Sequence, residues 1–383
     1  MPGEVRSVQS SGAFLGKKSD YIACNGRLWY YRPREKYEII IRFKGHMHYS
    51  TTLTGTEPVV LTIGNFDGVH TGHQGLMREV CRLAERLHSR PVLLTFQLHT
   101  LKVLRPEIEL RCLTTLEEKL ALARVYGGIA DSIVVEFTRE VASMSAGEFM
   151  DDLRAHFNLR GLVVGEDFSL GHNRMGTITF LRDYGEEHQV EVLPIPLEEM
   201  QYQRVSSTRI RRLVSEGDVA QAGELLGHAF MLNGVVVRGD QRGRLLGFPT
   251  ANLLPPPDKL IPANGVYAAR VLVAKESAQS DAIHSPCVLI DDRVNRGETP
   301  GRWDAYNSAV NIGVRPTFDG QRLLIEPHLL DVADIDLYDR CIGVHFLARL
   351  RSEQRFADID ALKAQIAEDV RNARILLQKD GQE

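Results

Sequence analysis

Two histidines, His70 and His73, stand in the segment GNFDGVHTGHQG, between an apolar run and an amphipathic stretch. Gly64, Gly68 and Gly72 lie around them. Where a strand gives way to a helix, free backbone N–H groups and the helix dipole favour an anion. An imidazole can hydrogen-bond a phosphate or carry a proton that stabilises developing negative charge. The segment therefore predicts a phosphate-binding site.

Two other interpretations of this histidine pair stay open. His70 and His73 could be surface residues of a turn, or two ligands of a zinc ion. The sequence has no CxxC or HExxH segment that would supply further zinc ligands. A Walker loop, GxxxxGK[ST], is also missing from the sequence. The flanking glycines favour a phosphate over a metal as ligand. The phosphate would be bound by a loop that is not a Walker loop.

A second anion site is predicted by the segment RVSSTRIRRLV, which places hydroxyl groups at a helix start and guanidinium groups just inside it. These side chains are those of Ser206, Ser207, Thr208, Arg209, Arg211 and Arg212. Hydroxyls cap a helix N-terminus, and guanidinium groups bind phosphate by charge-assisted hydrogen bonds. An ordinary N-cap followed by a basic surface helix is the alternative. Two such sites in one domain favour a nucleotide polyphosphate as ligand.

A third constellation lies in GDQRGRLLGFPTANL, residues 239–253. Thr250 and Asn252 are two residues apart, so on an extended backbone their side chains point to the same side. Oxygen ligands of this kind suit a hard cation such as Mg²⁺. Gly239 and Gly243 would let the backbone close over phosphates. Alternatively, GFPTAN is no more than a turn.

Strands and helices alternate from Val59 to about residue 228, which predicts a parallel sheet covered by helices on both faces. Capping boxes are expected at Thr114 with Glu117 and at Ser145 with Glu148. Beyond residue 228, short strands separated by turn residues predict a compact antiparallel barrel closed by a C-terminal helix. We therefore expect an α/β domain at residues 58–228 and a barrel domain at residues 229–383.

Residues 1–57 carry no sustained period and are expected to be a leader of uncertain structure. Met47 lies twelve residues before the first predicted strand, so one hypothesis is that translation begins there. Residues 274–306 are polar and are expected to form a long loop within the barrel.

Composition narrows the classes of function. The 383 residues include 46 Lys and Arg against 50 Asp and Glu, a net charge of −4, so no global basic field indicates nucleic acid or an anionic membrane as a partner. No apolar run is long enough to span a membrane. The five cysteines are widely spaced and form no CxxC pair, which favours the cytoplasm. A small-molecule substrate is the expectation.

The segments GNFDGVHTGH and SSTRIR resemble the HxGH and SSTxIR signatures of the nucleotidyltransferase superfamily, specifically of the bacterial FAD synthetases. RCLTTLEEKLALA, VVGEDFSLGHNRMG and GDVAQAGELLG follow in that family's order. The stretch GDQRGRLLGFPTAN resembles the riboflavin kinase signature GxxxGRxLGFPTAN, and AVNIGVRPTF and LIEPHLLD follow. The chain thus resembles the bifunctional riboflavin kinase/FAD synthetase family from about Val59 to about Leu377. This resemblance implies a Rossmann-like nucleotidyltransferase domain followed by a small antiparallel β-barrel riboflavin kinase domain.

The resemblance also implies roles for residues of the α/β domain. His70 and His73 would be catalytic. The ATP of adenylyl transfer would be bound by Gly64, Phe66, Asp67, Gly72, Ser207, Thr208 and Arg211, and FMN by Phe96, His99, Asp167 and Phe168. One stretch departs from the family: TFQLHTL keeps the histidine of the usual F-x-P-H-P but lacks both prolines. Phe96 and His99 could therefore simply end a buried strand.

In the barrel, the resemblance implies that Glu326 is the general base that takes the proton from the ribityl 5′-hydroxyl of riboflavin. Thr250 and Asn252 would bind Mg²⁺. The ATP of the kinase reaction would be bound by Gly239, Gly243, Arg244, Pro249 and Asn311. Pro327 follows Glu326, and proline in a sheet is confined to edges and bulges.

The predicted function is flavin-coenzyme synthesis in two Mg²⁺-dependent steps. The barrel phosphorylates riboflavin with ATP to FMN, and the α/β domain transfers AMP from a second ATP to FMN, giving FAD and pyrophosphate. Two alternatives stay open: a riboflavin kinase alone, and a non-catalytic flavin- or nucleotide-binding regulator.

Overall fold

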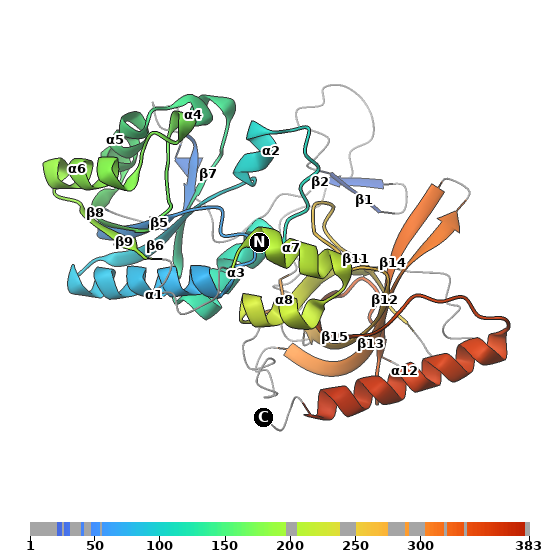
Figure 1. Cartoon of the computed structure of the whole chain (residues 1–383). Coiled ribbons are helices and arrows are strands. Elements are labelled where there is room, and N and C mark those ends of the chain that lie inside the picture. Colours follow the sequence, from blue (N-terminus) through green and yellow to red (C-terminus); the bar gives the residue numbers. More distant parts are fainter. Residues whose placement is uncertain are drawn as a thin grey trace, which may run out of the picture.

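The computed structural model describes residues 21–24, 27–30, 40–41, 47–53, 56–196, 205–237, 250–274, 288–290, 303–317, 320–332 and 335–379. An α/β body and a β-barrel body lie side by side, with the helices α7 (Ser207–Glu216) and α8 (Val219–Leu226) between them (Figure 1). A separate two-stranded antiparallel sheet comprises β1 (Tyr21–Cys24) and β2 (Arg27–Tyr30). The predicted fold class, a Rossmann-like domain followed by an antiparallel barrel, is confirmed.

The α/β body is built on a seven-stranded sheet in the order β3-β4-β7-β6-β5-β8-β9. Its strands are β3 (Ile40–Ile41), β4 (Tyr49–Thr51), β5 (Pro58–Ile63), β6 (Arg90–Phe96), β7 (Asp131–Val135), β8 (Asn158–Gly165) and β9 (Glu191–Ile195). The last five are parallel to one another, as predicted. The chain progresses outward from β5 through β6 to β7 and then resumes at β8 on the other side of β5. This reversal of strand order is the place where open α/β sheets bind ligands.

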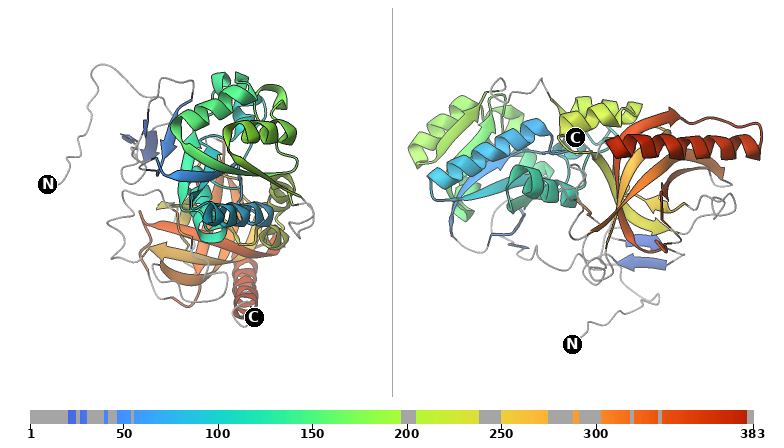
Figure 2. Two further views of the ribbon diagram at one scale, coloured as in Figure 1. Left: turned by 90° about the vertical axis from the view of Figure 1, so that its left-hand side faces the viewer. Right: turned by 90° about the horizontal axis from the view of Figure 1, so that it is seen from below.

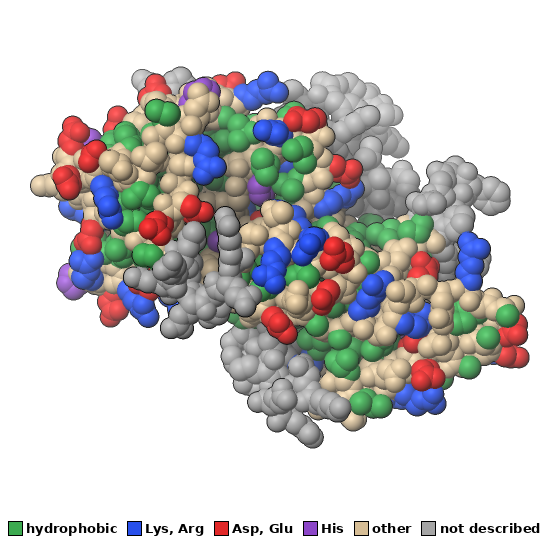
Figure 3. All heavy atoms as spheres, viewed as in Figure 1, with side chains coloured by type: hydrophobic (Ala, Val, Ile, Leu, Met, Phe, Trp, Pro, Cys, Tyr) green, Lys and Arg blue, Asp and Glu red, His purple; other side chains and the backbone are tan. Residues whose placement is uncertain are grey.

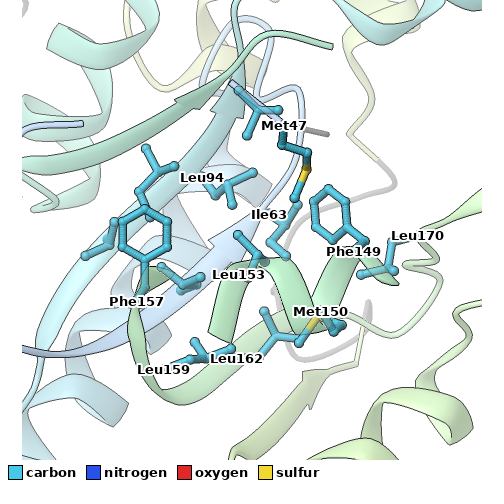
Figure 4. Packing of buried hydrophobic residues seen from close by; sticks show 14 of the residues in the cluster. Met47, Ile63, Leu94, Phe149, Met150, Leu153, Phe157, Leu159, Leu162 and Leu170 are labelled. Atoms are coloured by element: carbon cyan, nitrogen blue, oxygen red, sulfur yellow. The ribbon is translucent and has the colours of Figure 1, made fainter. Parts of the chain in front are cut away.

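Helices cover both faces of the sheet (Figures 1 and 2). On one face, α1 (Thr71–Arg86) and α3 (Leu116–Gly127) bury Met77, Val80 and Leu122 against the strands. On the other face lie α4 (Arg139–Ser143), α5 (Ala146–His156) and α6 (Ile178–His188). Their side chains share a core with the strand residues of that face (Figure 4). The short α2 (Thr100–Leu104) follows β6 and buries none of its residues.

Residues 47–53, expected within an uncertain leader, belong to the α/β sheet. Strand β4 pairs antiparallel with β7, and Met47 (Figure 4) and Tyr49 are fully buried in the core. Burial alternates from Met47 to Leu53, so every second side chain faces the core. The packed domain therefore begins before the predicted boundary at residue 58.

One predicted capping box is displaced by a residue. The capping box of α3 is formed by Thr115 and Glu118, not by Thr114 and Glu117. The Thr114 hydroxyl instead accepts the backbone N–H of Gly68 and donates to Asp67, so it is engaged by the loop after β5 and not by α3. The box of Ser145 with Glu148 is present at α5 as predicted.

The second body is a six-stranded antiparallel sheet in the order β11-β10-β15-β12-β13-β14. Its strands are β10 (Phe230–Val237), β11 (Asn252–Leu254), β12 (Gly265–Ala274), β13 (Trp303–Thr317), β14 (Gly320–Leu329) and β15 (Cys341–Ser352). The amide of Ala251 donates to the carbonyl of Pro327 at 3.0 Å, which joins the two outer strands and closes the barrel. Helix α12 (Ile359–Lys379) packs beside the barrel. Since β13 begins at Trp303, the predicted loop ends before residue 306.

Helices α7 and α8 contribute Ile210, Val214 and Ala222 to the hydrophobic core of the barrel, although they precede the predicted boundary at residue 228. A fully buried ion pair also crosses between the bodies, from Lys259 to Glu118 of α3. The two bodies therefore share a packed interface.

The surface is mixed in charge. Over the face in Figure 3, acidic and basic side chains are interspersed in the part of the chain that the structure describes. None of the described helices has the length and apolarity needed to cross a membrane.

Candidate active sites

The predicted phosphate site lies at the carboxyl end of the parallel sheet. Residues 64–70 connect β5 to α1, and residues 166–177 connect β8 to α6, so both loops flank the reversal of strand order. The N-terminus of α7 reaches the same place, since the Ser207 hydroxyl donates to the carbonyl of Asp67 at 2.9 Å. The structure thus brings together the HxGH and SSTxIR segments, which are more than 130 residues apart in sequence.

The two histidines are stacked. His70 is the N-cap of α1, and its Nδ1 accepts the backbone N–H of His73 at 3.3 Å. The ring centroids are 3.6 Å apart with an interplanar angle of 17°. The edge of Phe66 packs on His73 with the ring centroids 5.1 Å apart. This packing fixes both imidazole rings before any ligand binds.

Burial keeps both histidines neutral at pH 7. Burial lowers the pKa of His70 to about 4, and burial together with the nearby His70 and Lys119 lowers the pKa of His73 well below its usual value. Because His70 Nδ1 accepts a hydrogen bond, its neutral ring carries the proton on Nε2. His70 can therefore donate to an anion. Among the described atoms, His73 Nδ1 is buried without a hydrogen-bond partner.

The buried carboxylate of Asp67 bonds groups from two different parts of the site. Its carboxylate accepts the backbone N–H groups of Leu113 and Thr114 and the Thr114 hydroxyl, at 3.0 to 3.1 Å. Arg211 donates to the same carboxylate at 2.7 Å. Burial opposes ionisation, but Arg211 and the two amides outweigh it and lower the pKa of Asp67. With four donors already bound, the Asp67 carboxylate positions Arg211 and the start of α3.

Arg211 extends from α7 between Asp67 and His99, whose Nε2 lies 3.4 Å from the guanidinium. Its Nε is buried without a hydrogen-bond partner in the described structure. The helix begins where it was predicted: Ser206 is the N-cap of α7, and Thr208 is exposed in the first turn. Hydroxyl and guanidinium donors thus converge at one helix N-terminus, as an anion requires.

The glycines and Phe66 shape the loop after β5. Phe66 has a left-handed φ of 48° and a ring that is almost fully buried. A Cβ on Gly64 would lie 3.1 Å from that ring, so a larger residue there would press on it. Gly72 lies in the first turn of α1.

The residues predicted to bind FMN are divided between two loops. Phe96 is buried and packs edge-on against Phe137, so it ends a buried strand and offers little surface to a ligand. His99 is the N-cap of α2, where its Nδ1 accepts the backbone N–H of Leu101. Asp167 is exposed in the loop after β8, and Phe168 packs partly into the core. His99 and Asp167 therefore flank the sheet edge from opposite sides.

Lys119 is a residue at this site that the sequence did not reveal. It lies in the first turn of α3, is 6% exposed, and donates to the Thr95 hydroxyl at 3.0 Å and to the Phe96 carbonyl at 3.4 Å. Its helix is recognisable from its pattern. The contact of its ammonium with the end of β6 could not be predicted, because it depends on packing between elements that are distant in sequence.

Those predicted kinase residues that the structure describes lie at the closing edge of the barrel. Asn311 of β13 and Glu326 of β14 are cross-strand partners, and the Asn311 amide donates to Glu326 at 3.4 Å. The bond from Ala251 to Pro327 places Thr250 and Asn252 beside the strand that carries Glu326. Gly239, Gly243, Arg244 and Pro249 lie outside the described residues.

Pro327 fits this position because β14 is an outer strand of the sheet order, where a missing backbone N–H is tolerated. Its carbonyl accepts the closing hydrogen bond from Ala251. Pro327 therefore leaves Glu326 in register opposite Asn311.

Comparisons with known proteins match both bodies. The model of the family described as FAD synthetase matches residues 53–209, and that of riboflavin kinase matches residues 226–377. The chain is 37% identical over 320 residues to a bifunctional riboflavin kinase/FMN adenylyltransferase of Escherichia coli strain K12, covering 83% of this chain and 92% of that protein. It is 35% identical over 324 residues to the protein of the same name from Pseudomonas fluorescens, with the same coverage.

Among solved structures, the chain resembles a crystal structure described as a macrolide-efflux protein from Streptococcus pneumoniae. The TM-score is 0.69 at 28% sequence identity, and the match covers 84% of this chain and 95% of that one. The likeness extends over both bodies.

Proposed function

This chain belongs to the family of bifunctional riboflavin kinase/FMN adenylyltransferases, and we propose that its two reactions take place at the two sites described above. The enzyme phosphorylates riboflavin to FMN with ATP and adenylylates FMN to FAD. We assign FMN formation to the edge of the barrel around Glu326, and FAD formation to the sheet edge around His70 and His73.

For adenylyl transfer, the FMN phosphate is already a nucleophile at neutral pH, so no strong base is required. The attacking phosphate oxygen forms a bond to the α-phosphorus of ATP, and the bond from that phosphorus to the pyrophosphate oxygen breaks. We assign His70 Nε2–H, Arg211 and the hydroxyls of Ser207 and Thr208 to the ATP phosphates, where they stabilise the charge that moves onto pyrophosphate. His73 would also contact these phosphates.

We propose a positioning role for Asp67 in place of the predicted contact with ATP, because its carboxylate is already bonded by Leu113, Thr114 and Arg211. It would hold Arg211 and Ser207 in place, and Phe96, which is buried against Phe137, would support the end of β6. Gly64, Phe66 and Gly72 would form the loop around the nucleotide. His99, Asp167 and Phe168 would lie on the FMN side.

For riboflavin phosphorylation, Glu326 would accept the proton of the ribityl 5′-hydroxyl as the hydroxyl oxygen attacks the γ-phosphorus of ATP. The bond from that phosphorus to the bridging oxygen breaks, and ADP leaves. Asn311 donates to Glu326 and so fixes its carboxylate. Because Asn311 of the neighbouring strand holds it, the Glu326 carboxylate can receive the proton at a defined position.

Magnesium fits the oxygen donors beside Glu326. No group of three or more His, Cys, Asp or Glu side chains in the described ranges could hold a metal, so a cage made wholly of these protein ligands is not present there. Mg²⁺ commonly takes only one or two protein oxygens and completes its shell with phosphates and water. Thr250 and Asn252 could supply these, and the ion would neutralise charge on the ATP phosphates.

We further propose that the adenylyltransferase domain comprises residues 47–228, with α7 and α8 shared with the barrel, and that the kinase domain comprises residues 229–383. We expect the enzyme to work in the cytoplasm on riboflavin, FMN and ATP, without nucleic acid or membrane as a partner. On the face shown in Figure 3, acidic and basic side chains are interspersed, and no single-sign surface for nucleic acid or an anionic membrane is seen among the described residues there.

One observation carries the adenylyltransferase assignment: Ser207 and Arg211 of α7 both bond Asp67, which lies in the same loop as His70. Two variants test whether each site carries out only one of the two reactions. Glu326→Ala should abolish FMN formation from riboflavin and leave FAD formation from added FMN unchanged. His73→Ala should have the opposite effect. An equal loss of both reactions in either variant would refute the assignment of that residue.

A further inference from the structure

Lys119 carries a buried charge that the reaction described so far does not use. Its ammonium lies where the loop after β5, the end of β6 and the start of α2 meet. Thr95, which accepts one of its hydrogen bonds, in turn donates to the carbonyl of Asn65 at 3.4 Å. The Asn65 side chain bonds both the amide and the hydroxyl of Thr100, the first residue of α2. The ammonium therefore stands between the two sides of the proposed site.

No carboxylate forms an ion pair with Lys119 in the described part of the chain. Its acceptors are one hydroxyl and one carbonyl, so a third N–H has no protein acceptor there. Asp67 and Glu117 act on it only at longer range, and Asp67 is already paired with Arg211. A buried ammonium without a counter-charge is costly, and such groups are retained where a ligand supplies the charge.

The surroundings of Lys119 complete an anion site. Burial, with a smaller contribution from the nearby charge of Lys119, lowers the pKa of His73 and of His99, so both rings are neutral at pH 7. Arg211 and Lys119 therefore supply two positive charges against the single carboxylate of Asp67. Burial lowers the pKa of Lys119 itself to about 8, so it is still mainly protonated at pH 7. The remaining positive charge matches a substrate phosphate.

We propose that Lys119 is a catalytic residue of FMN adenylylation, whose ammonium binds a phosphate group of the reacting substrates. This inference rests on the adenylyltransferase activity proposed above. The phosphate is either that of FMN or one of those of ATP, and the two are chemically alike to an ammonium. On binding, the ligand supplies the missing counter-charge and the third hydrogen-bond acceptor.

Kinetics of FAD formation from added FMN test this role, with Lys119→Met, Lys119→Arg and the exposed Lys363→Met of α12 as matched control. We expect Lys119→Met to lower kcat/KM about 100-fold, because removal of one such donor typically has an effect of this size. Lys119→Arg should recover at least part of the loss. A rise in KM for FMN alone identifies the FMN phosphate, and a rise in KM for ATP alone identifies an ATP phosphate. FMN formation from riboflavin should be unchanged in every variant.

Thermal unfolding separates this role from a structural one. If Lys119 stabilises the fold, its replacement by Met should lower the unfolding temperature of the protein. If its buried charge serves only to bind a ligand, the replacement should not lower that temperature. We expect Lys119→Met to unfold at the same temperature as the wild type or higher. The inference is overturned if Lys119→Met forms FAD normally, or if it is destabilised and Lys119→Arg restores stability without FAD formation. Absence of FAD formation by the wild type would instead refute the proposed function.

Discussion

Loss of one partner of the ion pair between Lys259 and Glu118 should destabilise this protein more than loss of a surface ion pair. The side chains of both residues are fully buried, and they belong to different bodies of the fold. Glu118 also accepts the Asn233 amide at 2.8 Å and the Thr115 backbone N–H at 2.9 Å. Lys259 also donates to the carbonyl of Leu113 at 2.6 Å. The pair thus links the barrel to the start of the helix that carries Lys119.

Removal of one partner leaves the other charge buried, which costs about 3 to 5 kcal/mol. Lys259→Met leaves Glu118 with two neutral donors, so we expect a loss near the lower limit. Glu118→Gln leaves the buried Lys259 ammonium with neutral carbonyl acceptors and no counter-charge, so we expect a larger loss. In the double variant no charge remains, and its loss of stability should be smaller than the sum of the two single losses by about 2 kcal/mol or more.

Urea unfolding followed by circular dichroism measures these losses. The fluorescence of Trp29 and Trp303, the two tryptophans of the chain, gives a second probe, since Trp303 lies on β13 of the barrel. The matched control is Arg374→Met, which removes the exposed pair of Arg374 with Asp331. That change should cost no more than about 1 kcal/mol. If Lys259→Met costs as little as Arg374→Met, or if the two single losses add, the buried pair does not couple the two bodies.

Three further predictions concern the sites and the pH dependence of stability. Asp67→Asn weakens the hold on Arg211 and should lower kcat/KM for FAD formation about tenfold or more, while FMN formation from riboflavin is retained; unchanged FAD kinetics would contradict its positioning role. Thr250→Val should raise the Mg²⁺ concentration for half-maximal FMN formation about tenfold, whereas an unaltered Mg²⁺ titration would remove Thr250 from the metal site. Burial lowers the pKa of His70 and of His345 to about 4, against about 6.5 in the unfolded chain. The unfolded state therefore binds more protons between these values, so the stability that each neutral histidine contributes is complete above pH 6.5 and is lost as the pH falls toward 4, by up to about 3 kcal/mol per histidine. Urea midpoints measured from pH 7 to pH 4.5 should fall accordingly, and a flat profile would show that these rings are not held neutral.

The sequence predicted the parts of the fold that depend on local patterns. The alternation of strands and helices, the cap at Ser206 and the turn that carries His70 and His73 all follow from neighbouring residues. Spacing also placed Thr250 and Asn252 on one side of an extended segment. These features need no knowledge of what packs against them.

Features that depend on long-range packing could not be predicted in this way. Met47 and Tyr49 alternate with polar residues, which is a strand signal, but the run is short and only its pairing with β7 makes it part of the sheet. The capping box of α3 moved to Thr115 because Asp67, 47 residues earlier, engages Thr114. In the sequence, Lys119 is one of several charged residues on a helix. Only the structure shows that its ammonium is buried and donates to Thr95.

The shared position of α7 explains why the domain limits were the least predictable feature. One side of this helix presents Ser207 and Arg211 to Asp67, and another side buries Ile210 and Val214 in the barrel core. A pattern of apolar residues shows that a helix has a buried face. It does not show which of two neighbouring cores receives that face.

The most direct test of the account is a time course with the purified wild-type chain, riboflavin, ATP and Mg²⁺, in which the flavins are separated by chromatography. We expect FMN to appear first and FAD to follow as FMN accumulates, with pyrophosphate released in equal amount to FAD. FMN without FAD would contradict the assignment of adenylyl transfer to the site of His70 and His73. Unchanged riboflavin would contradict both sites.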